Sequence, residues 1–209
     1  MNSAFKRAFF AAALASLATP AFSQSATPTN APVPTIQDRK ENQQDRIANG
    51  VKSGELTAGE TKNLEKKESS LNQEERDMRK LDNGKLTASH RTTLKQQQNQ
   101  VSKQIYQDKH NAAAQNTNPK SEVGERQEKQ QDRIAQGIKS GQMTAGEAAK
   151  AENQQKNINK QVAADRQANG GTLTASEKKQ INKEQNAASK NIYHKKHNAK
   201  TQPQAQPKP

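Results

Sequence analysis

The segment QQDRIANGVKSGELTAGE at residues 43–60 decides the fold of this chain, because it returns as QQDRIAQGIKSGQMTAGE at residues 130–147. A shift of 87 residues aligns residues 38–112 with residues 125–199 without a gap, and 34 of the 75 aligned positions are identical. Self-similarity at a fixed distance is the sequence signature of a repeated structural unit. We therefore expect two tandem copies of one unit.

Each copy contains two turns of the pattern Gly-x-(Leu/Met)-Thr-Ala, and the four turns begin at Gly54, Gly84, Gly141 and Gly171. Glycine readily adopts the left-handed conformation that ends a helix. The threonine side chain can accept a hydrogen bond from a free backbone N–H at the start of the next helix. In three turns a glutamate follows three residues after the threonine, which is the capping-box pattern. The predicted helix caps are Thr57, Glu60, Thr87, Thr144, Glu147, Thr174 and Glu177.

These turns predict an all-α fold made of two tandem copies of an elongated three-helix unit. The expected helices span about 39–52, 58–81 and 88–111 in the first copy, and about 126–139, 145–168 and 175–198 in the second. The expected layout is a signal peptide at 1–23, a disordered linker at 24–37, a helical repeat at 38–112, a linker at 113–124, a second helical repeat at 125–199 and a disordered tail at 200–209.

The first residues have the pattern of a secretory signal peptide. Lys6 and Arg7 precede the apolar run Ala8–Leu17, and a small-residue site ends at Ser23. The run is shorter than the ~20 apolar residues that a membrane-spanning helix needs. We expect cleavage near Ser23 and an exported protein, periplasmic or extracellular, with no transmembrane segment after cleavage.

The composition argues against an enzyme. The chain has 209 residues, no cysteine and a formal net charge of +13, and residues 24–209 contain 22 large aliphatic or methionine side chains by our count of the sequence. So few apolar side chains are not enough to form a core and also line a deep apolar pocket. No nucleophile elbow, phosphate loop or metal-protease motif occurs in the sequence. We expect a non-enzymatic protein without a cofactor or a metal.

Apolar residues recur at spacings of seven and four along two expected helices of the first copy. They are Leu64, Leu71, Met78 and Leu81 in one helix and Leu94, Val101 and Ile105 in the other. Such narrow seams are typical of paired helices rather than of a broad globular core. Alanine or aspartate replaces four of these residues in the second copy, which predicts a less stable second copy. The seams suggest a protein partner or self-association through helices.

The turn Gly-x-Leu-Thr-x-x-Glu resembles the second half of an EF-hand calcium loop, and it is similar to the turn of exported bacterial SHOCT-like helical hairpins. The EF-hand resemblance implies a divalent-ion site. Calcium also needs side-chain oxygens at the first, third and fifth loop positions. In the first turn these positions hold Asn49, Val51 and Ser53, and none of the four turns has a carboxylate there. Calcium binding through degenerate loops is therefore an alternative, and helix capping is the preferred interpretation.

Both copies end with Ile-Tyr-x-x-Lys-His-Asn-Ala, which supplies the candidate interaction residues. These are Tyr106, Lys109, His110, Tyr193, Lys196 and His197. At a spacing of four, each tyrosine shares a helix face with its histidine. Two interpretations stand: a cationic aromatic spot for acidic or planar groups, or an ordinary helix end whose cations complement the helix dipole. We prefer the second.

A polar stripe also recurs, with Glu65, Asn72 and Arg79 in the first copy and Glu152, Asn159 and Arg166 in the second. A solvated helix flank is the preferred interpretation. Taken together, the sequence predicts an exported helical repeat protein, a binding or structural module that acts through helix–helix contacts and basic charge. Weak binding of polyanions, such as cell-wall polymers, lipopolysaccharide or nucleic acid, is a further alternative because the chain is basic.

Overall fold

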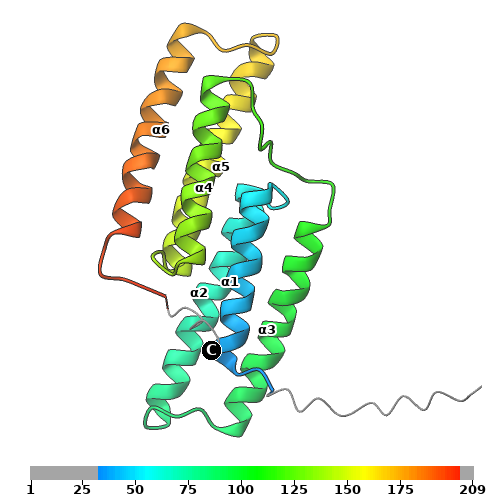
Figure 1. Cartoon of the computed structure of the whole chain (residues 1–209), viewed down its shortest axis with the longest axis vertical. Helices are drawn as coiled ribbons and strands as arrows, with labels where there is room; N and C mark the ends of the chain where they lie inside the picture. The colour runs from blue at the N-terminus through cyan, green and yellow to red at the C-terminus, as the bar shows by residue number, and fades with distance from the viewer. Residues whose placement is uncertain (1–32, 203–209) are drawn as a thin grey trace, which may run out of the picture. The chain divides into compact units, whose positions relative to one another are not determined.

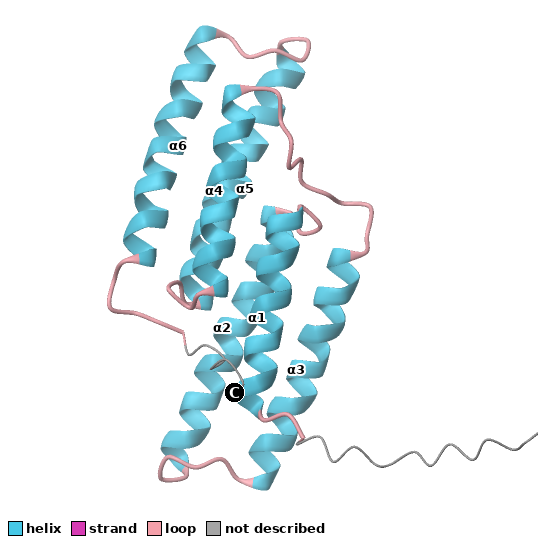
Figure 2. Cartoon of the chain, viewed as in Figure 1, coloured by secondary structure: helices cyan, strands magenta, loops and turns pink. Residues whose placement is uncertain are grey.

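The computed structural model describes residues 33–202, and over this range it contains helices and no strands (Figures 1 and 2). The helices are α1 (Ile36–Ser53), α2 (Ala58–Leu81), α3 (Ala88–Lys109), α4 (Glu122–Lys139), α5 (Ala145–Ala168) and α6 (Ala175–Lys196). The all-helical prediction is confirmed for this range. The expected signal peptide, and most of the expected terminal linker and tail, lie outside the described residues.

Two helices begin earlier than the sequence pattern predicts. The helix α1 begins at Ile36 because the Thr35 side chain accepts a hydrogen bond from Asp38 N, which completes a capping box. The helix α4 begins at Glu122 because the Ser121 side chain accepts from Gly124 N. These caps lack the preceding glycine, so the repeated turn pattern did not reveal them.

The largest helix–helix contacts join the two halves of the duplication. Within each half, the third helix packs on the first two, but α2 packs most extensively on α5, and α1 packs on α4. Gly59 lies against Lys156, and Gly146 lies against Ser69, so α2 and α5 run antiparallel. Within the described range, residues 34–202 belong to one compact unit.

The predicted apolar seams are mostly buried inside this unit. Leu64, Leu94 and Ile105 are at most 1% exposed, and they belong to one cluster that also includes residues of the second copy such as Ala151. The expectation that Leu81 extends the seam is wrong, since its side chain is 81% exposed. The core therefore forms mainly where one copy packs on the other.

The second copy has a smaller apolar cluster of its own. It contains Val123, Ile158, Val162, Ile181 and Ala188, with Leu173 packed against it. In the first copy the corresponding end of the helices is continuous with the main cluster. Over residues 33–202, no helix is both long and apolar enough to cross a membrane.

Candidate functional site

The repeated turns act as helix caps. In the first turn, Thr57 Oγ1 accepts from Glu60 N at 3.3 Å, and a Glu60 carboxylate oxygen accepts from Thr57 N at 2.9 Å. The same reciprocal bonds occur at Thr144–Glu147 and at Thr174–Glu177. Thr87 caps α3 through His90 N without a box. The carboxylates that a calcium loop would use are thus engaged at helix ends.

The ends of α3 and α6 carry the two aromatic side chains of the described range, and we call them the Tyr–His ends. Tyr106 stacks on His110 and Tyr193 on His197, each pair with ring centroids 4.1 Å apart. Both tyrosines are 59% exposed. Each imidazole Nδ1 lies 2.7–2.8 Å from the carbonyl oxygen of its own tyrosine, which fixes the ring orientation because a carbonyl can only accept.

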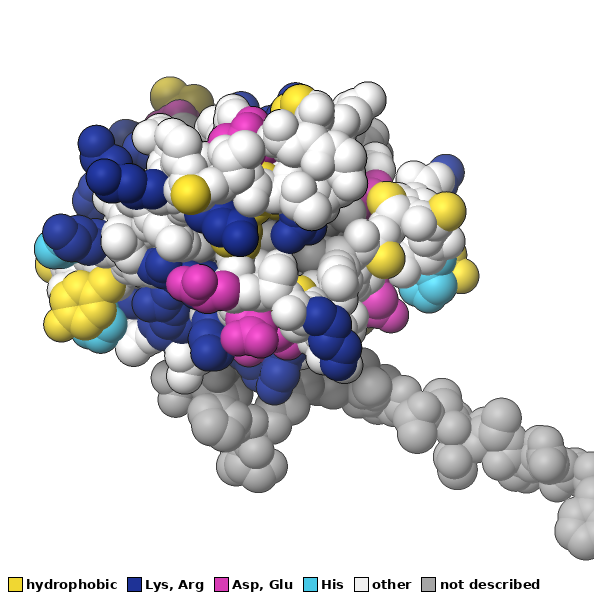
Figure 3. All heavy atoms as spheres, turned by 90° about the horizontal axis from the view of Figure 1, so that it is seen from above, with side chains coloured by type: hydrophobic (Ala, Val, Ile, Leu, Met, Phe, Trp, Pro, Cys, Tyr) yellow, Lys and Arg dark blue, Asp and Glu magenta, His cyan; other side chains and the backbone are white. Residues whose placement is uncertain are grey.

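The lysines at the two Tyr–His ends have different partners. Lys109 forms an ion pair with Glu55 at 3.2 Å, whereas Lys196 donates to the amide oxygen of Gln136 at 2.8 Å. A hydrogen bond from Ser53 and the bond from Lys109 lower the pKa of the Glu55 carboxyl. On the face seen in Figure 3, Lys and Arg side chains are interspersed with carboxylates. The charge is thus distributed over that face.

The residues after each Tyr–His end fold back onto the preceding turn. Asn111 donates to the capping Glu60 at 2.6 Å, and Asn198 donates to Glu147 at 2.7 Å. Further on, Gln115 N donates to Gly54 O, and Gln202 N donates to Gly141 O, both at 2.8 Å. The structural duplication therefore extends to residues 115 and 202, beyond the predicted boundaries. Gln115 and Gln202 are equivalent under the 87-residue shift, and this match is the sequence signal that could have extended the repeat.

The structure corrects the interpretation of Glu65 and Glu152 as parts of a solvated flank. Both residues are 0% exposed. One oxygen of Glu65 accepts from Gln44 at 3.3 Å, and one oxygen of Glu152 accepts from Gln131 at 3.0 Å. Their burial results from the packing of α2 on α5, which a single helix pattern does not reveal.

Glu68 lies in the same interior, and with Glu65 and Glu152 it forms what we call the buried glutamate centre. Both carboxylate oxygens of Glu68 lack a hydrogen-bond partner among the described residues. Burial raises the pKa of Glu68 to about 8 and that of Glu152 to about 8. Burial and the neighbouring Glu68 raise the pKa of Glu65 well above its ordinary value. At neutral pH the carboxyl groups of Glu68 and Glu152 are therefore mostly protonated, and burial disfavours the charged form of Glu65 in the same way.

Two polar grooves occupy equivalent places in the two copies. The first, which we call the Arg166 groove, has a volume of about 610 Å³. The second, the Arg79 groove, has a volume of about 420 Å³. Under the 87-residue shift seven lining positions are equivalent, and four of them hold the same residue, namely Thr57 with Thr144, Asn72 with Asn159, Arg79 with Arg166, and Gln115 with Gln202. The recurring polar stripe thus lines grooves as well as the interior.

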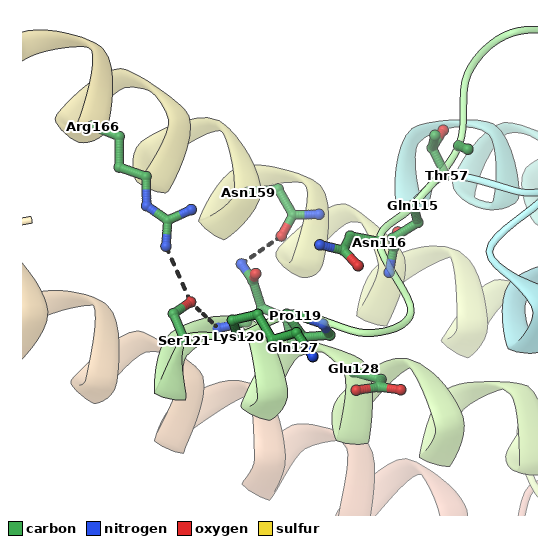
Figure 4. Close-up of a pocket in the computed structure, with 12 residues that line it drawn as sticks. Thr57, Gln115, Asn116, Pro119, Lys120, Ser121, Gln127, Glu128, Asn159 and Arg166 are labelled. Atoms are coloured by element: carbon green, nitrogen blue, oxygen red, sulfur yellow. Dashed lines mark hydrogen bonds between the residues drawn. The ribbon is translucent and has the colours of Figure 1, made fainter. Parts of the chain in front are cut away.

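The side chains of the Arg166 groove come from α4, from α5, from Thr57 at the N-cap of α2 and from the segment between α3 and α4 (Figure 4). Arg166 Nη2 donates to Ser121 Oγ at 3.2 Å, and Gln127 Nε2 donates to Asn159 Oδ1 at 2.6 Å. Within residues 33–202, no group of three or more histidine, aspartate or glutamate residues could hold a metal ion. The groove is therefore lined by amide, hydroxyl and charged groups.

Comparisons with protein-family models, with curated proteins and with solved structures found no match to this chain. The interpretation of the site therefore rests on its own geometry.

Proposed function

We propose that this chain is an exported, non-enzymatic binding and structural protein that uses its two Tyr–His ends to contact acidic partners. The observation that carries the proposal is the exposure of Tyr106 and Tyr193 at equivalent positions, each stacked on a histidine. A large exposed aromatic ring next to cations can bind planar or acidic groups. The basic net charge, +13 for the whole sequence with Lys6 and Arg7 of the expected signal peptide included, would add a general attraction for polyanions.

The apolar seams support a structural role within the chain. Leu64 and Leu71 are buried within the main apolar cluster, which supports a role for the seams in helix–helix contacts inside the chain. This internal use of the seams favours the Tyr–His ends over the seams as the surface for a separate partner. The copies would then act as a scaffold that holds both ends.

Heparin is a suitable probe for the proposed acidic partner. We expect the purified protein to bind heparin at low salt and the double variant Tyr106→Ala/Tyr193→Ala to bind about 5-fold or more weakly, because two aromatic contacts are lost. The matched control is Lys103→Gln/Lys190→Gln, which removes one exposed cation from the same helix of each copy. If both double variants lose heparin affinity equally, nonspecific charge attraction accounts for the binding and the proposal is wrong.

Calcium binding is a different class of function, and it has a simple test. Glu60 and Glu147 already accept hydrogen bonds in capping boxes, so a calcium ion would have to compete with the helix caps. We expect the melting temperature by circular dichroism to be the same in EDTA and in millimolar calcium. A marked rise with calcium would favour the divalent-ion alternative.

A further inference from the structure

We propose that the Arg166 groove binds a small ligand that carries one oxyanion next to hydroxyl groups, as a uronic acid or a sugar phosphate does. This inference does not depend on the Tyr–His ends. It rests on a comparison inside the molecule: the two equivalent grooves share their framework, but they differ in whether their polar groups are satisfied by the chain itself.

The first difference concerns the arginine. In the Arg79 groove, Arg79 Nε and Nη2 both donate to Glu75 at 2.8–3.0 Å, and Lys40 donates to the other oxygen of that carboxylate at 2.7 Å. The second copy has Val162 in place of Glu75. Among the described residues, Arg166 has no carboxylate partner, and its hydrogen bond goes to the Ser121 hydroxyl.

A guanidinium without a carboxylate retains N–H donors that suit a planar or tetrahedral oxyanion. Arg166 keeps all but one of its donors for such a ligand, since Ser121 takes a single bond. In Figure 4 its side chain extends from α5 toward Ser121 at the edge of the groove. In the Arg79 groove Glu75 engages the equivalent guanidinium, and the other arginine of that lining, Arg76, donates to Gln73 Oε1.

The second difference concerns the glutamine that closes each groove. Gln202 Oε1 accepts from the backbone N–H of Ala145 at 2.8 Å. The equivalent atom, Gln115 Oε1, is buried and has no donor among the described residues. A buried acceptor without a donor is costly, and a ligand hydroxyl would supply the missing hydrogen bond once the amide of this lining residue turns into the groove. The ligand therefore needs a donor as well as a negative charge.

The surroundings of the groove are mostly cationic. Lys120 lines it, together with one carboxylate, that of Glu128. Lys156 lies one helical turn from Asn159 on α5 and faces Lys62 of α2, whose pKa it lowers because the two ammonium groups repel each other. An anion in the groove would relieve part of this repulsion.

Isothermal titration calorimetry of the purified protein at low ionic strength tests the proposal with three probes. We expect glucuronate and glucose 6-phosphate to bind with one site per chain, and glucose to bind about 10-fold or more weakly because it lacks the oxyanion. The stronger of the two anionic probes identifies which source of the oxyanion the groove prefers. Absence of binding by both anions would overturn the proposal.

Matched variants locate the site. Arg166→Gln should weaken glucuronate binding about 10-fold or more, whereas Arg79→Gln should leave it unchanged. Lys120→Gln, in the segment between helices, should weaken binding about 2- to 5-fold without affecting the helices, and Glu128→Gln should strengthen it. Equal losses in the two arginine variants, or no loss in Arg166→Gln and Lys120→Gln, would overturn the proposal. Heparin binding of these variants separates this result from the role of the Tyr–His ends.

Discussion

Two features require glycine at position 54: a positive φ and close contact with a neighbouring backbone. The turn at Gly84 has only the first of them, so the two effects can be measured separately. Its φ is +76°, and a Cβ there would lie 2.5 Å from Gln115 O. Gly84 has a φ of +86°, but a Cβ there would meet nothing within 4 Å. We expect Gly84→Ala to cost about 1–2 kcal/mol of unfolding free energy from backbone conformation alone.

In Gly54→Ala the clash with the folded-back segment should add about 1–3 kcal/mol to this cost. Urea unfolding followed by circular dichroism measures both variants. Equal losses of stability would mean that the contact between Gly54 and Gln115 contributes nothing, and that the segment after α3 is held elsewhere.

Glu68 predicts a pH dependence of stability. Its folded pKa of about 8 lies above the ordinary value of 4.5. The protonated acid therefore contributes stability fully below pH 4.5, and this contribution is lost as the pH rises through about 8. Glu65 and Glu152 act in the same direction, while Lys40 of α1 partly opposes the shift at Glu68. The melting temperature should fall between pH 5 and pH 9.

The second copy shows how glutamine replaces this glutamate. Gln155, the equivalent of Glu68, donates to Gln130 Oε1 at 3.2 Å, and the matching acceptor Gln43 Oε1 has no partner in the described range. Glu68→Gln should therefore raise the free energy of unfolding by about 1–3 kcal/mol at pH 9 and change it little at pH 5. Asp132→Asn, at an exposed carboxylate, is the control. A pH-independent effect of Glu68→Gln would contradict the buried-acid explanation.

Among the elements, the end of the second copy that holds Ile158, Val162 and Ile181 should open first. Its apolar cluster is small and separate from the main core. We expect native-state hydrogen exchange to show lower protection there than at Leu71 and Leu94, the equivalents of Ile158 and Ile181. Asp165→Met restores the residue of the first copy and should stabilise this end by about 0.5–1 kcal/mol. If amide protection is equal at the two ends, the separate apolar cluster does not make the end of the second copy less stable.

The local elements were predictable because their signals are local. The turn around Thr57 and Glu60 contains its glycine, cap and capping acid within seven residues, and the start of α2 at Ala58 follows from it. The burial of Glu65 and the unmatched guanidinium of Arg166 were not predictable from such patterns. Both depend on how α2 and α5 pack and on which partner occupies an equivalent place in the other copy.

For the whole molecule, the contact between α2 and α5 joins equivalent faces of the two copies, because Leu64 and Ala151 are equivalent positions and both lie in the shared core. A contact between equivalent faces can form between two identical chains as well. A fragment of residues 33–118 would expose its half of this core. We expect it to associate as a dimer through two antiparallel α2 helices, measured by sedimentation equilibrium.

In such a dimer, Glu65 of one fragment would lie near Glu65 of the other, as Glu65 lies near Glu152 in the whole chain. Two buried carboxyl groups resist ionisation, so the dimer should dissociate more readily at pH 9 than at pH 5. Leu64→Ala should weaken it because the side chain is fully buried at this interface. A fragment that stays monomeric and melts cooperatively would show that one copy folds alone, and that the packing between copies is not what stabilises the core.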